Sequence, residues 1–216
     1  MPSPIAHAVT GYALTHIFSN RLKSRNNLKH SSSKGPLKGP KSPLKRSLRG
    51  LYPLLSPLAI YAIVVSILPD LDFLPQLITQ QRFHRGPTHS LFIGFLLSFL
   101  LSVMAQALFK KIGQSGKHKS LSYKTLFTFT FSLYLTHLCL DSVTVGGPGM
   151  KFLWPLSDRY LRAPFSLFPG VHHSRGLWDN SHLIFITIET LYSIVLISIL
   201  KVFPTRPSYR NQPIEK

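Results

Sequence analysis

Histidine and aspartate residues, the side chains best suited to hold a divalent metal ion and to move protons, form three clusters in this chain. The chain has only 7 acidic residues, and three of them stand beside histidine-bearing motifs at the ends of apolar segments. A carboxylate beside a segment of membrane length is costly unless it is paired or coordinated, so it indicates a functional site. The clusters contain Asp70, Asp72, His84, His89, His137 and Asp141.

The first cluster is the segment LPDLD, in which Pro69 follows an apolar run and can end a helix. Asp70 and Asp72 then lie in a turn. Two carboxylates one residue apart can converge on a metal ion in an irregular turn, whereas on a regular strand they would face opposite ways. Helix termination and capping by aspartate would account for the same pattern.

The second cluster is the segment HRGPTHS, whose glycine and proline bend the chain. His84 and His89 could therefore both point into one pocket. We expect Arg85 to pair with a carboxylate or to contact an anionic substrate. Thr88 or Ser90 is expected to cap the following helix rather than to act as a nucleophile.

The third cluster has the strongest local geometry, because His137 and Asp141 are four residues apart near the end of an apolar segment. This spacing puts both on one helical face, where they can share an ion or form a structural hydrogen bond. His7 stands alone near the start of the chain. Gly11, one turn later, is a small residue that would let another helix approach closely.

Together these candidates supply histidine nitrogens and carboxylate oxygens but no thiolate, a set that suits zinc, with manganese or iron as alternatives. The seven candidates exceed the needs of one tetrahedral ion, so a site with several metals, or one metal with supporting aspartates, would use them all. Such a site yields hydroxide near neutral pH and favours hydrolysis. We find no serine triad or phosphate-cradling glycine loop, and Cys139 lies inside an apolar run. The predicted ligands are His7, Asp70, Asp72, His84, His89, His137 and Asp141, and the predicted catalytic residues are Asp70, Asp72, His84, Arg85, His89 and Asp141.

Long apolar segments must position these residues. Four have about the length that crosses a bilayer as a helix, and a fifth is shorter and contains two histidines. The sequence therefore predicts an all-α, multi-spanning membrane helix bundle with four to five transmembrane helices, although core helices of an unusually apolar domain would look alike. The segments are Leu51–Leu68, Leu91–Phe109, Leu126–Leu140, His182–Phe203 and the shorter Ile5–Phe18.

The basic residues are segregated from these apolar segments. The chain has 25 lysines and arginines and a formal net charge of +18. Under the positive-inside rule, the basic segments 21–49 and 110–124 and the C-terminal tail lie in the cytoplasm. The protein is then a multi-pass membrane protein, with one membrane-embedded domain over residues 1–204, a basic flexible insert at 21–49 and a cytoplasmic tail at 205–216.

Anionic lipid is the expected partner of the basic loops. The basic insert lacks interleaved aromatic residues for base stacking, so no specific nucleic acid is expected. The same topology places His7 level with the loops 69–90 and 141–181, on the side opposite the basic segments. We therefore expect the clusters to meet at one membrane level.

These motifs resemble those of the YdjM-type inner-membrane metal-dependent hydrolases over roughly residues 5–169. The elements that carry the resemblance are HAVTG, LPDLD, HRGPTHS, THLCLDSVTVGG and LWPLSDR. The resemblance implies a multi-helix membrane protein with a hydrolase site of poorly defined substrate. A fainter similarity runs to the zinc-dependent phospholipase C and nuclease group, whose helices supply histidines and aspartates to a zinc cluster.

The leading hypothesis is a membrane-embedded metal-dependent hydrolase acting on a phosphoester or other ester, including a lipid. A metal-ion or proton-coupled transporter and a non-enzymatic membrane scaffold are the alternatives. Five further residues are left outside the site. It stays open whether a second histidine-rich stretch adds ligands through His172, His173, Asp179 and His182. Glu189, inside the last apolar run, should point into the bundle.

Overall fold

The computed structural model describes residues 4–30, 56–75, 85–113, 121–145, 147–169 and 180–202. Within them the chain forms long α-helices joined by short 3₁₀ segments and one ordered loop, and no extended strand is formed. The predicted all-α class is confirmed. The elements are α1 (Pro4–His30), α3 (Pro57–Ile67), η1 (Leu68–Asp72), η2 (Pro87–His89), α5 (Leu91–Gly113), α6 (Tyr123–Ser142) and α7 (Asn180–Val202).

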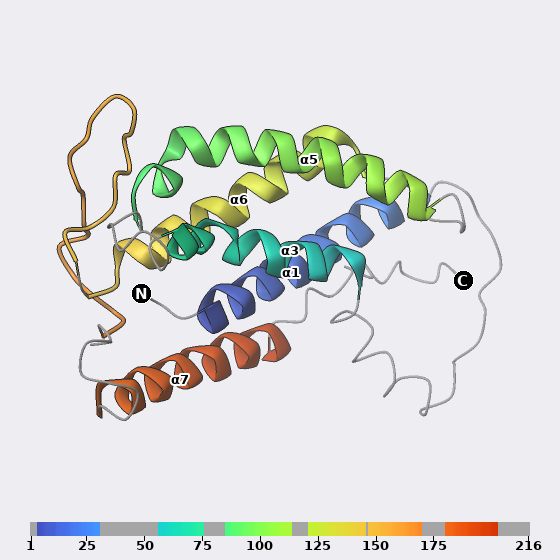
Figure 1. Ribbon diagram of the computed structural model, residues 1–216. Helices are drawn as coiled ribbons and strands as arrows, with labels where there is room; N and C mark the ends of the chain where they lie inside the picture. Colours follow the sequence, from blue (N-terminus) through green and yellow to red (C-terminus); the bar gives the residue numbers. More distant parts are fainter. Residues whose placement is uncertain are drawn as a thin grey trace.

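Successive helices run side by side in alternating directions (Figure 1). The start of α1, the end of α3, the start of α5 and the end of α6 consequently lie at one end of the bundle, the left end in Figure 1. The predicted clusters all stand at these helix ends. Alternation of direction is therefore what brings them to a common level.

Three helical segments are long and apolar enough to cross a membrane: Pro57–Pro75, Leu91–Lys111 and Leu183–Val202. No more than a third of the apolar stretch of each is buried, as expected of helices that face lipid. The expected bundle of membrane helices is confirmed, but α1 and α6 fall outside this apolar set. The second half of α1 is basic, and α6 is rich in hydroxyl side chains.

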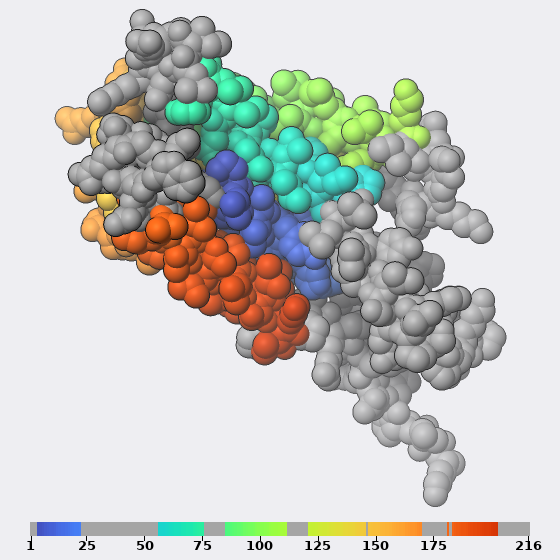
Figure 2. All heavy atoms as spheres, turned by 60° about the horizontal axis from the view of Figure 1, so that its bottom comes forward, coloured from blue at the N-terminus to red at the C-terminus, as the bar shows by residue number. Residues whose placement is uncertain are grey.

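Helices α1 and α6 run through the middle of the bundle. Helix α6 packs against α5 and α3, whereas α1 packs against α3 and α7 and also touches α6. Phe18 of α1 stacks on Phe129 of α6, with ring centroids 4.4 Å apart. Helix α7 lies along α1 on the outside (Figure 2). Helix α1 is thus largely covered by its neighbours, whereas α6 keeps an exposed face that carries Thr128 and Ser132.

Serine residues begin three of the helices. The Oγ atoms of Ser56, Ser90 and Ser122 accept hydrogen bonds from backbone N–H groups three residues later, at 3.2–3.3 Å. Such N-caps satisfy N–H groups that have no partner within the helix. Ser90 therefore performs the capping role expected of it or Thr88.

Small residues let α5 approach α6 closely. Ser90, Gly94, Ser98 and Ser102 recur every fourth residue, so they share one face of α5. A Cβ at Gly94 would lie 2.6 Å from the ring of Tyr134 on α6. Small residues at this spacing are typical of helix packing in membranes.

Gly11 performs the same role between α1 and α3. A Cβ at this position would lie 2.3 Å from Oγ of Ser66 and 3.0 Å from the carbonyl oxygen of Ala62. The close approach predicted for Gly11 is therefore present. Because His7 stands one turn before Gly11, this contact draws His7 towards the end of α3.

The loop after α6 covers the end of the bundle that carries the clusters. Met150 and Leu161 exchange two backbone hydrogen bonds of 2.9 Å, and the side chains of Met150 and Phe168 are buried. The loop also donates from the N–H of Lys151 to the carbonyl of Arg85. It is thus joined directly to the turn that precedes η2.

Helix α1 is longer than the apolar pattern predicts. It continues to His30, ten residues into the segment expected as a flexible basic insert. Residues 21–30 contain neither glycine nor proline, so nothing in their sequence ends the helix. The remainder of the expected insert, from residue 31, lies outside the described residues.

We predict that Gly11→Ala lowers the free energy of unfolding by about 1–3 kcal/mol, because its methyl group overlaps Ser66. Thermal unfolding in detergent, followed by circular dichroism, measures the effect. The double variant Gly11→Ala with Ser66→Ala removes the overlapping hydroxyl and should recover part of the loss. Equal stability of wild type and Gly11→Ala would contradict this packing.

Candidate metal centre

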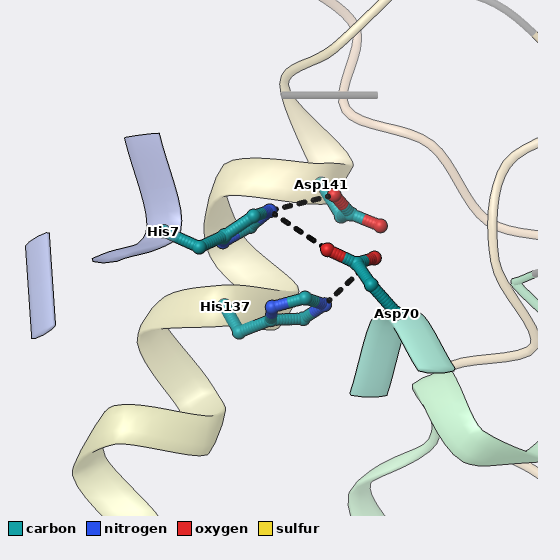
Figure 3. A group of neighbouring side chains, drawn as sticks. All are labelled: His7, Asp70, His137 and Asp141. Atoms are coloured by element: carbon teal, nitrogen blue, oxygen red, sulfur yellow. Dashed lines mark ion pairs between the residues drawn. The ribbon is translucent and has the colours of Figure 1, made fainter. Parts of the chain in front are cut away.

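Four buried side chains from three elements converge at the end of the bundle (Figure 3). His7 comes from the first turns of α1, Asp70 from η1, and His137 and Asp141 from the end of α6. One ligand atom from each lies within 4.8 Å of the others. This group could hold a metal ion.

The spacing of the ligand atoms suits a shared cation. His7 Nε2 lies 3.4 Å from Asp141 Oδ1 and 3.8 Å from Asp70 Oδ2, and His137 Nε2 lies 3.6 Å from Asp70 Oδ1. Two atoms that each bind a tetrahedral zinc ion at about 2.1 Å are about 3.4 Å apart. The side chains therefore need only small movements to reach coordination distance.

The two carboxylates of the group have an unusual environment. Asp70 is 7% exposed and Asp141 is 1% exposed, yet their oxygens accept no well-formed hydrogen bond from the described residues. The two ring nitrogens of His7 are likewise buried and form no hydrogen bond with the described residues. Buried polar atoms are ordinarily hydrogen-bonded, whereas these instead make ion-pair contacts with one another and with His89 and Arg85, a pattern that fits a site able to hold a cation.

A backbone contact fixes the tautomer of His137. Its Nδ1 lies 2.8 Å from the carbonyl oxygen of Ser66. Because a carbonyl only accepts, Nδ1 must carry the proton, which leaves the lone pair of Nε2 directed at Asp70. Histidines that bind metals are commonly oriented in this way.

His89 adjoins the group without belonging to it. Its Nε2 lies 3.2 Å from Asp141 Oδ2 and 3.3 Å from His137 Nε2. Its Nδ1 lies 3.1 Å from Oδ2 of Asp72. His89 can thus serve as a further ligand or as a proton carrier at the edge of the site.

Asp72 lies outside the group of four and contacts the other ring nitrogen of His89, although the sequence predicts it as a ligand. Its Oδ2 accepts hydrogen bonds from Oγ1 of Thr88, at 2.5 Å, and from the N–H of Arg85, at 3.2 Å. The 3₁₀ geometry of η1 turns Asp70 and Asp72 in different directions. Asp72 therefore orients His89 and the turn before it, and it is not among the four grouped ligands.

The carboxylates around His89 control its protonation. Burial alone would lower the pKa of His89, but Asp141, Asp70 and Asp72 together hold this pKa well above its usual value. In the metal-free protein the imidazole is therefore readily protonated. Metal binding to the imidazole of His89 would release a proton.

Arg85 contributes a positive charge to the group, the nearest arginine or lysine in the part of the chain that the structure describes. Its Nε lies 3.4 Å from Asp141 Oδ2, and the residue is buried with a backbone φ of 61°. A positive φ in a residue other than glycine costs free energy and is concentrated at functional sites. Among the described residues, Asp70, Asp72, Asp141 and Arg85 leave two negative charges in excess when the histidines are neutral, which a divalent cation would balance.

Several predicted or open candidates cannot be placed. His84, His172, His173 and Asp179 lie outside the described residues, and the side chain of His182 is not described. Glu189 is 2% exposed, so it points into the bundle as expected.

The supporting contacts were not visible in the sequence. Ser66 acts through its backbone carbonyl, which no residue pattern reveals. Tyr134 donates from its hydroxyl to the carbonyl of Thr88 and so holds η2 in place. A tyrosine three residues before His137 on the same helix was the only signal of this role.

The fold and the buried cluster define a multi-helix membrane protein with a candidate metal centre. The chain belongs to the YdjM inner membrane protein family, whose model matches residues 1–208. It is similar to the inner membrane protein YbcI of Escherichia coli (strain K12), with 38% identity over 114 residues. That alignment covers 49% of this chain and 57% of YbcI, so the chain spans little more than half the length of this relative. No solved structure matches the chain.

We predict that zinc stabilises the chelator-treated protein, because the ion would neutralise buried carboxylates. At a free zinc concentration about 100 times the Kd, the free energy of unfolding should rise by about 2.7 kcal/mol. Thermal unfolding with and without zinc measures the difference.

Asp70→Asn is expected to abolish the zinc-dependent rise while preserving side-chain shape. Asp158→Asn is the matched control, because Asp158 is exposed and pairs with Lys151 outside the group. A full zinc response in Asp70→Asn would exclude Asp70 as a ligand.

Proposed function

We propose that this membrane protein is a metal-dependent hydrolase, in which water activated by a divalent ion attacks a phosphoester or other ester, including a lipid ester. The observation that carries the proposal is the group of His7, Asp70, His137 and Asp141, with ligand atoms within 4.8 Å of one another. Its two carboxylates make ion-pair contacts but accept no hydrogen bond from the part of the chain that the structure describes. Such unsatisfied buried groups are unfavourable for stability alone and indicate function.

Zinc is the proposed ion, with manganese and iron as alternatives. The group offers two imidazole nitrogens and two carboxylates, without thiolate. Imidazole favours transition metals over calcium or magnesium, which prefer sites built entirely from oxygen ligands. A bound ion of this kind would polarise the ester and lower the pKa of water near it.

The residues around the group have roles that fit hydrolysis. His89 presents Nε2 to the group while Asp72 holds its Nδ1, an arrangement that lets a histidine carry a proton to or from a reacting group. Arg85 adjoins Asp141 and supplies a guanidinium that can bind an anionic oxygen of a phosphoester. Binding, orientation and proton transfer would thus come from three neighbouring side chains.

We also propose that the end of the bundle opposite the candidate centre faces the cytoplasm and contacts anionic lipid. Basic residues gather there: Lys110 and Lys111 end α5, Lys124 begins α6 and Lys201 ends α7. Lysines at helix ends on one side set orientation in the membrane. The candidate centre would then lie on the outer side of the inner membrane.

Purified wild type should contain at least one metal ion per chain and hydrolyse nitrophenyl phosphate or carboxylate esters in detergent. His137→Ala should lose metal, and Asp141→Asn should lower kcat/KM by about 100-fold or more. Elemental analysis and steady-state kinetics measure the two effects, with Asp158→Asn as the control. Hydrolysis that survives in these variants, or zinc uptake into proteoliposomes without hydrolysis, would refute the proposal.

Replacing the five basic residues between 31 and 46 with glutamine should reduce the anionic lipid that co-purifies with the protein. Each basic residue near a charged membrane contributes about 1 kcal/mol, and salt should weaken the wild-type contact. Native mass spectrometry counts the bound lipids. The metal content should stay unchanged, and its loss would show that this segment supports the centre.

A further inference from the structure

The loop of residues 150–167, which covers the metal-centre end of the bundle, exposes an unusual number of large apolar side chains. Leu156 at its tip is 92% exposed, more than any other large hydrophobic residue in the described part of the chain. Five further large side chains of the loop are more than 40% exposed: Leu153, Tyr160, Leu161, Phe165 and Leu167.

This exposure comes from an ordered structure. Two backbone hydrogen bonds between Met150 and Leu161 close the base of the segment, and Met150 is fully buried. The turn at the tip is closed by hydrogen bonds from the N–H groups of Leu156 and Ser157 to the carbonyl of Leu153. The backbone therefore holds Leu156 outward.

The loop continues the lipid-facing surface of α5. The ring of Trp154 lies 6.4 Å from the ring of Phe92, the second residue of α5, which is itself 47% exposed in a segment suited to span the membrane. Tryptophan is enriched where a membrane protein leaves the hydrocarbon core. The base of the loop thus lies at the level where lipid headgroups begin.

The charges beside the apolar tip are complementary to lipid phosphates. Asp158 is paired with Lys151 at 2.7 Å, whereas Arg159 and Arg162 are exposed. The loop therefore presents excess positive charge next to exposed leucines. Apolar residues that enter the acyl region beside basic residues at headgroup level are typical of segments bound at a membrane interface.

We propose that the loop of residues 150–167 lies in the membrane interface on the metal-centre side, with Leu156 inserted between lipids and with Arg159 and Arg162 on lipid phosphates. Two backbone hydrogen bonds transmit this anchoring to the site: the N–H of Lys151 donates to Arg85, and the N–H of Leu91 donates to Phe152. The membrane surface then supports the turn that carries Arg85. This inference does not depend on hydrolysis.

Site-directed spin labelling tests the loop in the full-length protein. Cys139 is the single cysteine, so Cys139→Ser allows one label to be placed at Leu156→Cys in vesicles of mixed zwitterionic and anionic lipid. The label should collide with oxygen more than with a water-soluble nickel reagent, as should a lipid-facing reference at Phe99→Cys. An aqueous reference at Glu215→Cys, in the expected cytoplasmic tail, should show a smaller preference for oxygen.

The lipid charge supplies the second comparison. Purely zwitterionic vesicles, or Arg159→Gln with Arg162→Gln, should move the Leu156 label towards water. A label that meets both reagents as a free aqueous residue does would overturn the proposal. A label shielded from both would do the same, because a protein partner or a second copy of the chain would then cover the loop.

Tryptophan fluorescence provides an independent measurement in a chain that keeps Cys139. The sequence has two tryptophans, so Trp178→Phe leaves Trp154 as the only reporter. Lipids brominated near the headgroup should quench its emission more strongly than lipids brominated near the chain ends. Equal and weak quenching by both would place the loop in water and refute the inference.

Discussion

The cost of burying Asp70 and Asp141 in an apolar bundle is the constraint on which the architecture depends. Removing a carboxylate from water is tolerated only if positive charge or hydrogen-bond donors replace the lost hydration. Here the replacements come from histidines on α1, η2 and α6 and from one arginine in the turn that precedes η2. Helices far apart in sequence must therefore end at the same level, because each contributes a group that the carboxylates require.

Close helix packing makes this convergence possible. Gly11 lets α1 approach α3, and Gly94 lets the ring of Tyr134 lie against α5. Both glycines stand one or two turns from the site, where a small rise in helix separation would move the side chains of the candidate metal centre apart. The small residues and the polar cluster therefore form one functional unit.

The sequence predicted the helical membrane fold, and four of its seven candidate ligands lie together, because apolar segments of membrane length and rare acidic residues are strong local signals. It did not separate Asp70 from Asp72, since that distinction depends on the 3₁₀ turn of η1 and on a hydrogen bond from Thr88. The length of α1 was also underestimated, because its basic second half lacks the apolar pattern used to define the helix. Contacts made by backbone atoms, such as the carbonyl of Ser66, leave no trace in residue types.

The wide sequence separation of His7 and Asp141 has a consequence for biogenesis. The ribosome makes His7 first. Asp70, which follows α3, is made later, and the group of four is complete only when the end of α6 has emerged. An early helix with an unsatisfied histidine must therefore wait in the membrane while most of the chain is synthesised. Capture of an ion would be a late event that joins the oldest segment to a much younger one, with α7 still to be added against α1.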